Sequence, residues 1–431
     1  MTEGARGYRE ALDFLFARTT GGTKVGLERT LALLAALGDP QRRVPAFHVA
    51  GTNGKGSTCA MLEALLRRRG LRVAKYTSPH LVDFRERILV NGAPISEAGV
   101  VEWVERWTAE CERIGATFFE ATTAMAFDHF AAAGADVAVI ETGLGGRLDS
   151  TNVLEHPLAA GITAIGMDHQ EYLGTTLEAI AAEKAGIFKA GCPAVVGEWD
   201  PAVRRLLARL AAAAGADPVR VVADEFELAD VRLDGGRTRF TVSRPGQAPA
   251  ELATPLLGAH QARNALVALA MLETAGPAYA LDASAVREAL AGVRLPGRFQ
   301  RSGRFLFDVA HNPDGAAVLA RTLIDVGVAR PAVALLTVLA DKDWRGMMRA
   351  LAPAVDRFVL THSPTAPAQR AWSAAEAQAF AAGEGWSAEH EPNFERALER
   401  AARLGETVVV TGSFHTVGDA MARLQLSPLS P

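Results

Sequence analysis

The sequence predicts an α/β protein: a larger N-terminal part with a mostly parallel sheet flanked by helices, and a smaller C-terminal Rossmann-like α/β part. Short apolar runs rich in Val and Ile alternate with longer helical patterns through most of the 431 residues, which is typical of parallel sheets. A chain of this length exceeds what one hydrophobic core usually supports. Leu295-Pro-Gly-Arg298 has the turn residues of a linker.

The N-terminal part is expected to contain alternating strands and helices. The strands are expected at Val44–Val49, Leu71–Tyr76, Val137–Ile140, Ala159–Ile165 and Ala194–Gly197. The helices are expected at Thr58–Arg69, Ser96–Ile114 (with Ser96 as N-cap), Ala121–Ala133, Thr175–Phe188 and Ala202–Ala214. A hairpin over Val221–Val242, turning at Asp234-Gly-Gly-Arg237, then interrupts the alternation, and helices at Gln261–Thr274 and Ala283–Gly292 complete this part.

A second α/β series follows the linker. Its strands are expected at Phe305–Val309, Ala332–Leu339, Phe358–Thr361 and Thr407–Thr411. The predicted division is therefore an N-terminal domain of residues 1–295, a linker of residues 296–300 and a C-terminal domain of residues 301–431.

Composition excludes several classes of protein. The net charge of -4 gives no reason to expect nucleic acid or an anionic membrane as a partner. Three cysteines lie far apart without a C-x-x-C pair, which fits free thiols in a reducing compartment. No apolar run is long enough for a membrane span, and the N-terminus lacks the apolar region of a signal peptide. We expect a cytoplasmic, monomeric protein.

The segment Val49-Ala-Gly-Thr-Asn-Gly-Lys-Gly-Ser-Thr58 predicts a P-loop-type phosphate-binding site between a strand and a helix. Glycine lets the backbone approach a phosphate, and N–H groups at a helix N-terminus attract it. Lys55 would reach the terminal phosphates, and Ser57 or Thr58 the Mg²⁺. The spacing departs from G-x-x-x-x-G-K-[ST], because Gly56 separates Lys55 from Ser57.

Four consecutive strand ends carry the groups that a Mg-nucleotide site needs. After the phosphate loop, the next ends deliver Ser78, Glu141 and Asp168-His169. Ligands bind at the carboxyl ends of parallel strands, so these groups are expected to converge. Each also has a plainer interpretation, such as a capping serine in a proline turn for Ser78 or an acid that caps the next turn for Glu141.

Two further positions have both a functional and a plain interpretation. Lys184, near the end of a predicted helix, has the position of a solvated lysine that complements the helix dipole. Asp308 and His311 follow the first strand of the C-terminal part, where an acid and an imidazole can also be purely structural.

Taken together, the motifs resemble those of bacterial folylpolyglutamate synthase/dihydrofolate synthase enzymes, a group of the Mur-ligase-like ATP-dependent amide ligases. The resemblance extends from near residue 20 to near residue 417. The motifs that carry it include Ala50-Gly-Thr-Asn-Gly-Lys-Gly-Ser57, Thr77-Ser-Pro-His-Leu81, Glu141-Thr-Gly-Leu-Gly-Gly-Arg-Leu-Asp149, Glu183-Lys-Ala-Gly-Ile187, Leu295-Pro-Gly-Arg-Phe-Gln300 and Phe307-Asp-Val-Ala-His-Asn-Pro313.

The resemblance implies an N-terminal domain like the central domain of Mur ligases and a ligase activity. ATP would phosphorylate a carboxylate of 7,8-dihydropteroate or a reduced folate, and the amine of L-glutamate would attack the acyl phosphate. Lys55, Glu141, His169 and Lys184 would be the catalytic residues, with Lys184 carrying a carbamate. Ser78, Glu141 and His169 would ligate Mg²⁺, with two ions favoured by the charge count, and would replace Ser57 as the leading metal ligand.

Binding residues are likewise implied by the resemblance. The nucleotide would be bound by Thr52, Asn53, Gly54, Lys55, Gly56, Ser57, Asn264, Arg298 and Asp308. The pterin substrate would be bound by Thr23, Lys24, Val25, Thr117, Phe118, Phe119, Glu120, Leu148, Asp149 and Ser150. L-Glutamate would be bound by His311 and Ser413 of the C-terminal domain.

Three alternatives remain open at this point. A folylpolyglutamate synthase without dihydrofolate synthase activity would fit the same motifs. A Mur ligase acting on a UDP-muramoyl precursor shares the Gly-Thr-Asn-Gly-Lys segment, but it usually places the hydroxyls directly after the lysine, whereas Gly56 intervenes here. A nucleotide-dependent switch would explain the loop but not Glu183-Lys-Ala-Gly186 or the C-terminal part.

Overall fold

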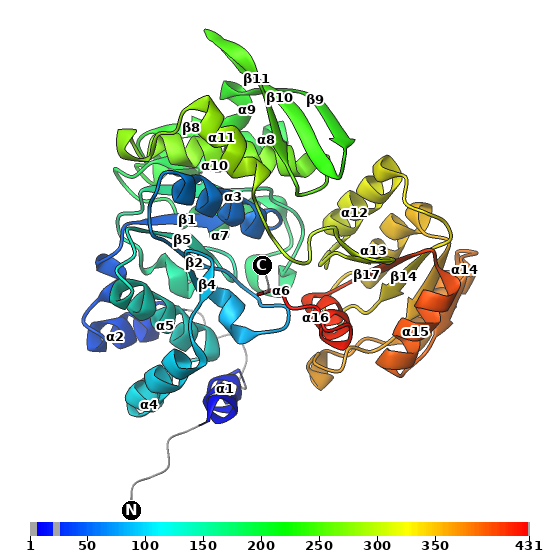
Figure 1. Ribbon diagram of the computed structural model, residues 1–431. Helices are drawn as coiled ribbons and strands as arrows, with labels where there is room; N and C mark the ends of the chain where they lie inside the picture. The colour runs from blue at the N-terminus through cyan, green and yellow to red at the C-terminus, as the bar shows by residue number, and fades with distance from the viewer. Residues whose placement is uncertain (1–6, 20–25, 430–431) are drawn as a thin grey trace, which may run out of the picture.

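The computed structural model describes residues 7–19 and 26–429. It confirms the predicted α/β class, with a large, mostly parallel sheet followed by a smaller C-terminal α/β part (Figure 1). The large sheet has eight strands in the order β4-β3-β2-β5-β1-β6-β7-β8. Its strands are β1 (Ala46–Ala50), β2 (Val73–Tyr76), β3 (Ile88–Val90), β4 (Ala93–Pro94), β5 (Val137–Glu141), β6 (Ala159–Ile162), β7 (Ala194–Val196) and β8 (Val219–Val221).

The neighbours β2, β5, β1 and β6 lie at the centre of this sheet and pair in parallel. Only β3 and β4, at one edge, are antiparallel. All five residues of β1 and of β5 are buried, because helices cover both faces of a parallel sheet. The carboxyl ends of the four central strands therefore open on one side of the molecule, as the sequence predicts.

Helices of the N-terminal part form two layers around the sheet. They are α1 (Tyr8–Ala17), α2 (Glu28–Ala36), α3 (Lys55–Arg68), α4 (Glu97–Ile114), α5 (Phe118–Ala132), α6 (Gln170–Leu173), α7 (Leu177–Ala185), α8 (Pro201–Ala213), α9 (Val222–Glu225), α10 (Ala259–Thr274) and α11 (Ala283–Ala291). One face packs against α3, α10 and α11 through Phe47, Val49 and Val139. Residues that alternate with these face the other side: Ala50 packs with α7 and α8, and Ile140 packs with α1, α2, α4 and α5.

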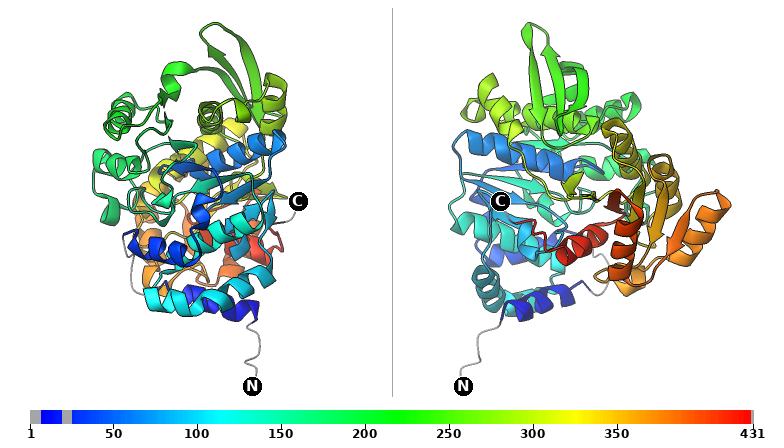
Figure 2. Two further views of the ribbon diagram at one scale, coloured as in Figure 1. Left: turned by 90° about the vertical axis from the view of Figure 1, so that its left-hand side faces the viewer. Right: turned by 45° about the vertical axis from the view of Figure 1, so that its right-hand side comes forward.

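Several local expectations differ from the structure: β6 ends at Ile162 rather than Ile165, and α5 begins at Phe118 rather than Ala121. Helix α3 begins earlier than Thr58, at Lys55, because Gly54 adopts a left-handed φ of 92° and is the N-cap. The helix expected at Thr175–Phe188 is shorter and consists of α7 alone. It begins after Thr176, because the Thr176 side chain caps it by accepting a hydrogen bond from the N–H of Ala179. The expected hairpin is a three-stranded antiparallel sheet of β9 (Glu227–Asp234), β10 (Arg237–Arg244) and β11 (Gln247–Thr254), and Val222–Glu225 is helical. Both views of Figure 2 show this small sheet at the opposite end of the molecule from α1.

The C-terminal part has a six-stranded sheet in the order β12-β13-β17-β14-β15-β16, in which only β12 is antiparallel. Its strands are β12 (Gln300–Ser302), β13 (Phe305–Phe307), β14 (Ala332–Leu336), β15 (Arg357–Leu360), β16 (Ala388–His390) and β17 (Thr407–Thr411). Its helices are α12 (Pro313–Val326), α13 (Trp344–Leu351), α14 (Ala374–Gly383), α15 (Phe394–Leu404) and α16 (Phe414–Arg423). Helices α12–α14 cover one face and α15–α16 the other.

Within the described ranges, no helix is both long and apolar enough to cross a lipid bilayer.

Helix α16 lies against the loop that follows β2. A Cβ atom at Gly418 would lie 1.9 Å from the carbonyl oxygen of Leu81. The approach of helix to loop therefore requires glycine at this position.

We predict that Gly418→Ala destabilises the protein, although alanine favours helix by about 1 kcal/mol over glycine. The methyl group would collide with the backbone of Leu81 and push α16 away from the loop. Gly383→Ala, at the end of α14, is the matched control, since a Cβ atom added there would meet no other atom within 4 Å. Thermal unfolding should show a lower Tm for Gly418→Ala and an equal or higher Tm for Gly383→Ala. A rise in Tm for both variants would contradict the contact.

Candidate functional site

One cavity of about 1040 Å³ lies between the N-terminal and C-terminal parts. The phosphate loop and the ends of β2, β5 and β6 line it from one side, and the ends of β13, β14 and β17 from the other. Among its lining residues are Gly51, Ser78, Glu141, His169, Lys184, Asn264, Arg298, Asp308, His311 and Ser413. Groups that are far apart in the sequence therefore face the same space.

The phosphate loop is held in shape by its own lysine. Lys55 is the first residue of α3, and its Nζ donates to the carbonyl oxygens of Gly51 (3.0 Å) and Thr52 (3.1 Å). An ammonium group has three donors, so one remains for a ligand. Thr52 Oγ1 donates to the carbonyl oxygen of Gly166 at 3.1 Å, which ties the loop to the segment after β6. Ser57 is buried within the first turn of α3.

Glu141, at the end of β5, is a buried carboxylate beside this loop. It accepts a bond from the N–H of Ser78 at 3.3 Å. Burial raises the pKa of Glu141, and the charges of Lys55 and Arg298 oppose that shift. A Cβ atom at Gly56 would lie 3.9 Å from Glu141 Oε2 and 4.0 Å from Arg298 Nη2. Gly56 thus keeps open a space between the loop, a carboxylate and a guanidinium.

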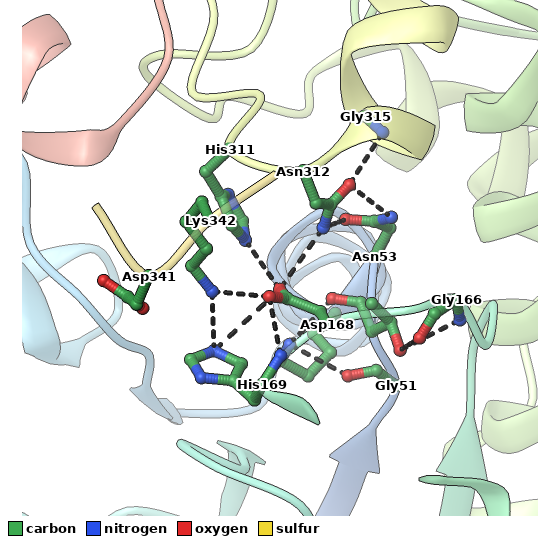
Figure 3. A network of polar contacts seen from close by, with 12 residues as sticks. Gly51, Asn53, Gly166, Asp168, His169, His311, Asn312, Gly315, Asp341 and Lys342 are labelled. Carbon is green, nitrogen blue, oxygen red and sulfur yellow. Dashed lines mark hydrogen bonds and ion pairs between the residues drawn. The ribbon is translucent and has the colours of Figure 1, made fainter. Parts of the chain in front are cut away.

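Asp168, just after β6, is the centre of a polar network that joins the two parts (Figure 3). Its carboxylate accepts from Lys342 Nζ at 2.5 Å and from Asn312 Nδ2 at 3.3 Å, and it lies 3.3 Å from His311 Nε2. The side chains of Asp168 and Lys342 are 6% and 7% exposed. Burial alone would raise the pKa of Asp168, but His311, His169 and Lys342 hold it well below its usual range.

His169 points toward Lys342, with its Nε2 3.5 Å from Lys342 Nζ. Burial lowers the pKa of His169 to about 4, so the ring is neutral at pH 7 and has a lone pair to offer. The structure thus brings Ser78 and Glu141 together, while His169 belongs to the Asp168 network. Among the described residues, no group of three His, Cys, Asp or Glu side chains forms a ready metal site.

Lys184 is buried in α7, where its Nζ donates to the carbonyl oxygen of Gly51 at 2.9 Å. Burial, together with the charge of Lys55, lowers its pKa to about 7. The interpretation of Lys184 as a solvated lysine at a helix end is therefore wrong, because its side chain points inward onto the phosphate loop.

Three residues predicted to bind the nucleotide lie near the junction of the two parts. Asn264, in α10, lies against the loop: a Cβ atom at Gly54 would lie 2.5 Å from Asn264 Oδ1. Asp308 accepts from the N–H groups of Phe299 and Ala310, both at 3.0 Å. Asn53 and Asn312 exchange hydrogen bonds between their side-chain amides and so link the two parts.

Of the predicted pterin residues, Phe118 lines the cavity, while the other described ones do not. Thr117 caps α5, and Glu120 pairs with Arg29 at 2.8 Å. Phe119 packs against Tyr76 with ring centroids 6.0 Å apart. Asp149 accepts from the N–H groups of Gly143 and Leu144 and so shapes the loop after β5. Leu148 and Ser150 flank it, and Thr23, Lys24 and Val25 lie outside the described residues.

On the glutamate side, Ser413 is the N-cap of α16 and His311 follows β13. The His311 Nδ1 atom lies 2.9 Å from the carbonyl oxygen of Val309, and its Nε2 faces Asp168. Both ring nitrogens therefore face oxygen atoms.

Several residues of the site were missed from the sequence, namely Lys342, Asn312, Arg87, His80 and Phe16. Lys342 follows β14, so the strand-end rule that selected Glu141 could have found it. Phe16 comes from α1, which no sequence pattern had indicated.

Comparison with known proteins places this geometry in a family. The Mur ligase middle domain matches residues 49–272, and the Mur ligase glutamate ligase domain matches residues 297–414. The dihydrofolate synthase/folylpolyglutamate synthase of Mycobacterium tuberculosis is 38% identical, over 91% of this chain and 89% of that protein.

Solved structures of the same group of enzymes are also similar to this chain. Escherichia coli FolC in complex with DHPP and ADP superposes with a TM-score of 0.85 at 32% identity, covering 99% of each chain. A bifunctional folylpolyglutamate synthase/dihydrofolate synthase with Mn, AMPPNP and L-glutamate bound gives a TM-score of 0.84 at 34% identity, covering 98% of this chain and 100% of that one. The chain belongs to the Mur ligase family and, within it, to the dihydrofolate synthase/folylpolyglutamate synthase group.

Proposed function

We propose that this protein is an ATP-dependent ligase that adds L-glutamate to 7,8-dihydropteroate and to reduced folates. The observation that carries the proposal is the single cavity that receives both the phosphate loop and the strand ends of the C-terminal part. Relatives of the same length and fold, solved with ADP and DHPP or with AMPPNP and L-glutamate, support it. We further propose that residues 1–295 and 301–431 act as two domains joined at 296–300, in a cytoplasmic monomer.

In this proposal the triphosphate binds at the N-terminus of α3. The backbone N–H groups of residues 53–57 and the remaining donor of Lys55 hold the β- and γ-phosphates. Arg298, which lies near Gly56, adds positive charge at the same point, and Asn264 and Asp308 contact the nucleoside. These groups position the γ-phosphate for in-line attack.

The residues present suit a divalent cation. Glu141 is a buried carboxylate with one long hydrogen bond, and Ser78 and the neutral His169 also line the cavity. Oxygen ligands are those that Mg²⁺ prefers. One or two such ions, when bound, would offset the repulsion between the triphosphate and the acceptor carboxylate.

Two group transfers follow. An oxygen of the acceptor carboxylate attacks the γ-phosphorus, ADP leaves, and an acyl phosphate forms. The neutral amine of L-glutamate then attacks the acyl carbon, the C–O bond to phosphate breaks, and the nitrogen loses a proton, so that the products are the amide and inorganic hydrogen phosphate. His311 and Ser413 would hold the incoming glutamate from the C-terminal side, and Lys342 adds a positive charge that suits a dicarboxylate.

The direct test measures ADP release with ATP, Mg²⁺ and L-glutamate. We predict glutamate-dependent release with both 7,8-dihydropteroate and tetrahydrofolate. Release with tetrahydrofolate alone would restrict the activity to folylpolyglutamate synthase. Release with a UDP-muramoyl peptide and with neither pterin would identify a cell-wall ligase and refute the proposal.

We also propose that Lys184 carries a carbamate, because its lowered pKa of about 7 leaves the amine reactive toward CO₂. Roughly one amine in ten is neutral at pH 6 and roughly nine in ten at pH 8. A ¹³C carbamate signal formed from ¹³CO₂ should therefore increase as the pH rises through 7. Lys184→Met should abolish the signal, whereas Lys189→Met should preserve it. A signal that persists in Lys184→Met would assign the carbamate elsewhere.

Asp168 should be a strong determinant of stability, because its removal leaves the buried Lys342 ammonium unpaired. We predict that Asp168→Asn lowers the free energy of unfolding by about 3 kcal/mol. The depressed pKa of Asp168 makes its contribution complete above pH 3.8, the ordinary value, and lost as the pH falls further. Denaturant titration at pH 7 measures the effect.

The double variant Asp168→Asn/Lys342→Met should regain much of that stability, since no buried charge is left without its partner. Asp341→Asn is the control for a single lost carboxylate: its pair with Arg370 is exposed, so a change below about 1 kcal/mol is expected. Equal losses in the single and double variants would contradict the assigned pairing.

A further inference from the structure

Arg87 has no role in the proposed transfer of glutamate, although its surroundings are unusual for an arginine. It is the last residue of a short 3-10 helix, Phe84–Arg87, that follows the loop after β2. Only 7% of the residue is exposed, yet it lines the cavity. None of the ion pairs found within residues 7–19 and 26–429 includes it, although both neighbouring ionisable side chains of the turn, Arg85 and Glu86, are engaged by this chain's own groups.

One edge of the Arg87 guanidinium is occupied. Its Nε donates to His80 Nδ1 at 2.8 Å, and its Cζ lies 5.1 Å from the centroid of the Phe118 ring. The two terminal NH₂ groups have no hydrogen bond to a described residue and are not enclosed. A guanidinium that is held at Nε and by an aromatic face presents the remaining donors in a fixed plane.

The space beside Arg87 is aromatic. Phe16 stacks on Phe118 with ring centroids 5.3 Å apart, and Phe84 meets Phe118 edge-on at 6.2 Å. Phe16 is 41% exposed, although it is a large apolar side chain. These rings suit a flat, conjugated ligand rather than a triphosphate, whose binding groups are those of the phosphate loop.

Arg87 also lies toward the reacting end of the site. Its carbonyl oxygen accepts from the N–H of Thr77 at 3.1 Å, next to Ser78. Burial lowers the pKa of Arg87, and the charges of Tyr76, Glu86 and Glu141 oppose that shift. Ser78, whose N–H binds Glu141, precedes Arg87 on the same loop. A buried cation without an anionic partner is costly to maintain unless a ligand supplies the partner.

We infer that Arg87 binds the carboxylate of the pteroate substrate, through the two terminal NH₂ groups, while Phe16, Phe84 and Phe118 enclose the aromatic ring that bears this carboxylate. Arg87 would hold the carboxylate beside Glu141 before phosphoryl transfer. This inference rests on the proposed function and deepens it, by naming the residue that recognises the acceptor group.

The experiment pairs a change in the protein with a change in the ligand. Pteroate and its carboxamide, which lacks the negative charge, are titrated into the wild-type protein and into Arg87→Met by calorimetry. We expect the wild type to bind pteroate about 10- to 100-fold more tightly than the carboxamide. Arg87→Met should bind the two ligands about equally, because only the charged group has lost its partner.

Arg85→Met is the matched control. Arg85 lies on the same turn, pairs with Asp83 at 2.7 Å and does not line the cavity. It should retain the full preference for pteroate. Titration of ADP into Arg87→Met tests the other anion in the cavity: unchanged affinity is expected, whereas a loss for ADP with no loss for pteroate would reassign Arg87 to the nucleotide.

The outcomes separate the two proposals. If the wild type binds neither pteroate nor its carboxamide, the proposed function fails. If the wild type prefers pteroate and Arg87→Met keeps that preference, only the role of Arg87 is overturned. Should Arg87→Met fail to fold, Arg87→Lys takes its place: it keeps the charge but loses the planar pair of donors, so its preference for pteroate should be weaker than that of the wild type but not abolished. A full wild-type preference in Arg87→Lys would overturn the paired contact.

Discussion

The carboxylate of Asp168 is the interaction on which the arrangement of the site depends. It follows β6 of the N-terminal sheet, but three of its partners, Lys342, His311 and Asn312, come from the C-terminal part. In a buried setting such a charge must be balanced, and the balance here is achieved only when the two parts are together. The pairing of Asp168 thus holds the two sides of the cavity together.

Much of the fold and a substantial part of the site could be predicted from sequence. The alternation of strands and helices was sufficient because both faces of a parallel sheet are buried, and so its strands are short and apolar throughout. The rule of strand ends placed Ser78 beside Glu141 and the phosphate loop, because β2, β5, β1 and β6 are neighbours in the sheet. The roles assigned to these residues stay predictions.

The sequence does not show which residues of distant segments lie close together when those segments have no periodic pattern. Lys184 has the sequence context of a surface lysine, and only the packing of α7 shows that it points onto Gly51. The pairing of Lys342 with Asp168 joins positions separated by 174 residues. The predicted helix boundaries were wrong where a glycine or a capping side chain determines the end of the helix, as at Gly54 and Thr176. Such end effects involve single hydrogen bonds, which are small beside the hydrophobic pattern.

The contact between Gly418 and Leu81 has a consequence for how such proteins can be recombined. The loop that contains Leu81 also contains Ser78 and His80, so the surface that receives α16 is made of the same residues that face the cavity. A C-terminal part taken from a relative would meet this loop through its own residue at the position of Gly418. A chimaera whose donor has a larger residue at this position would therefore keep its cleft only if the loop after β2 were transferred together with the C-terminal part, although the two lie in different halves of the chain.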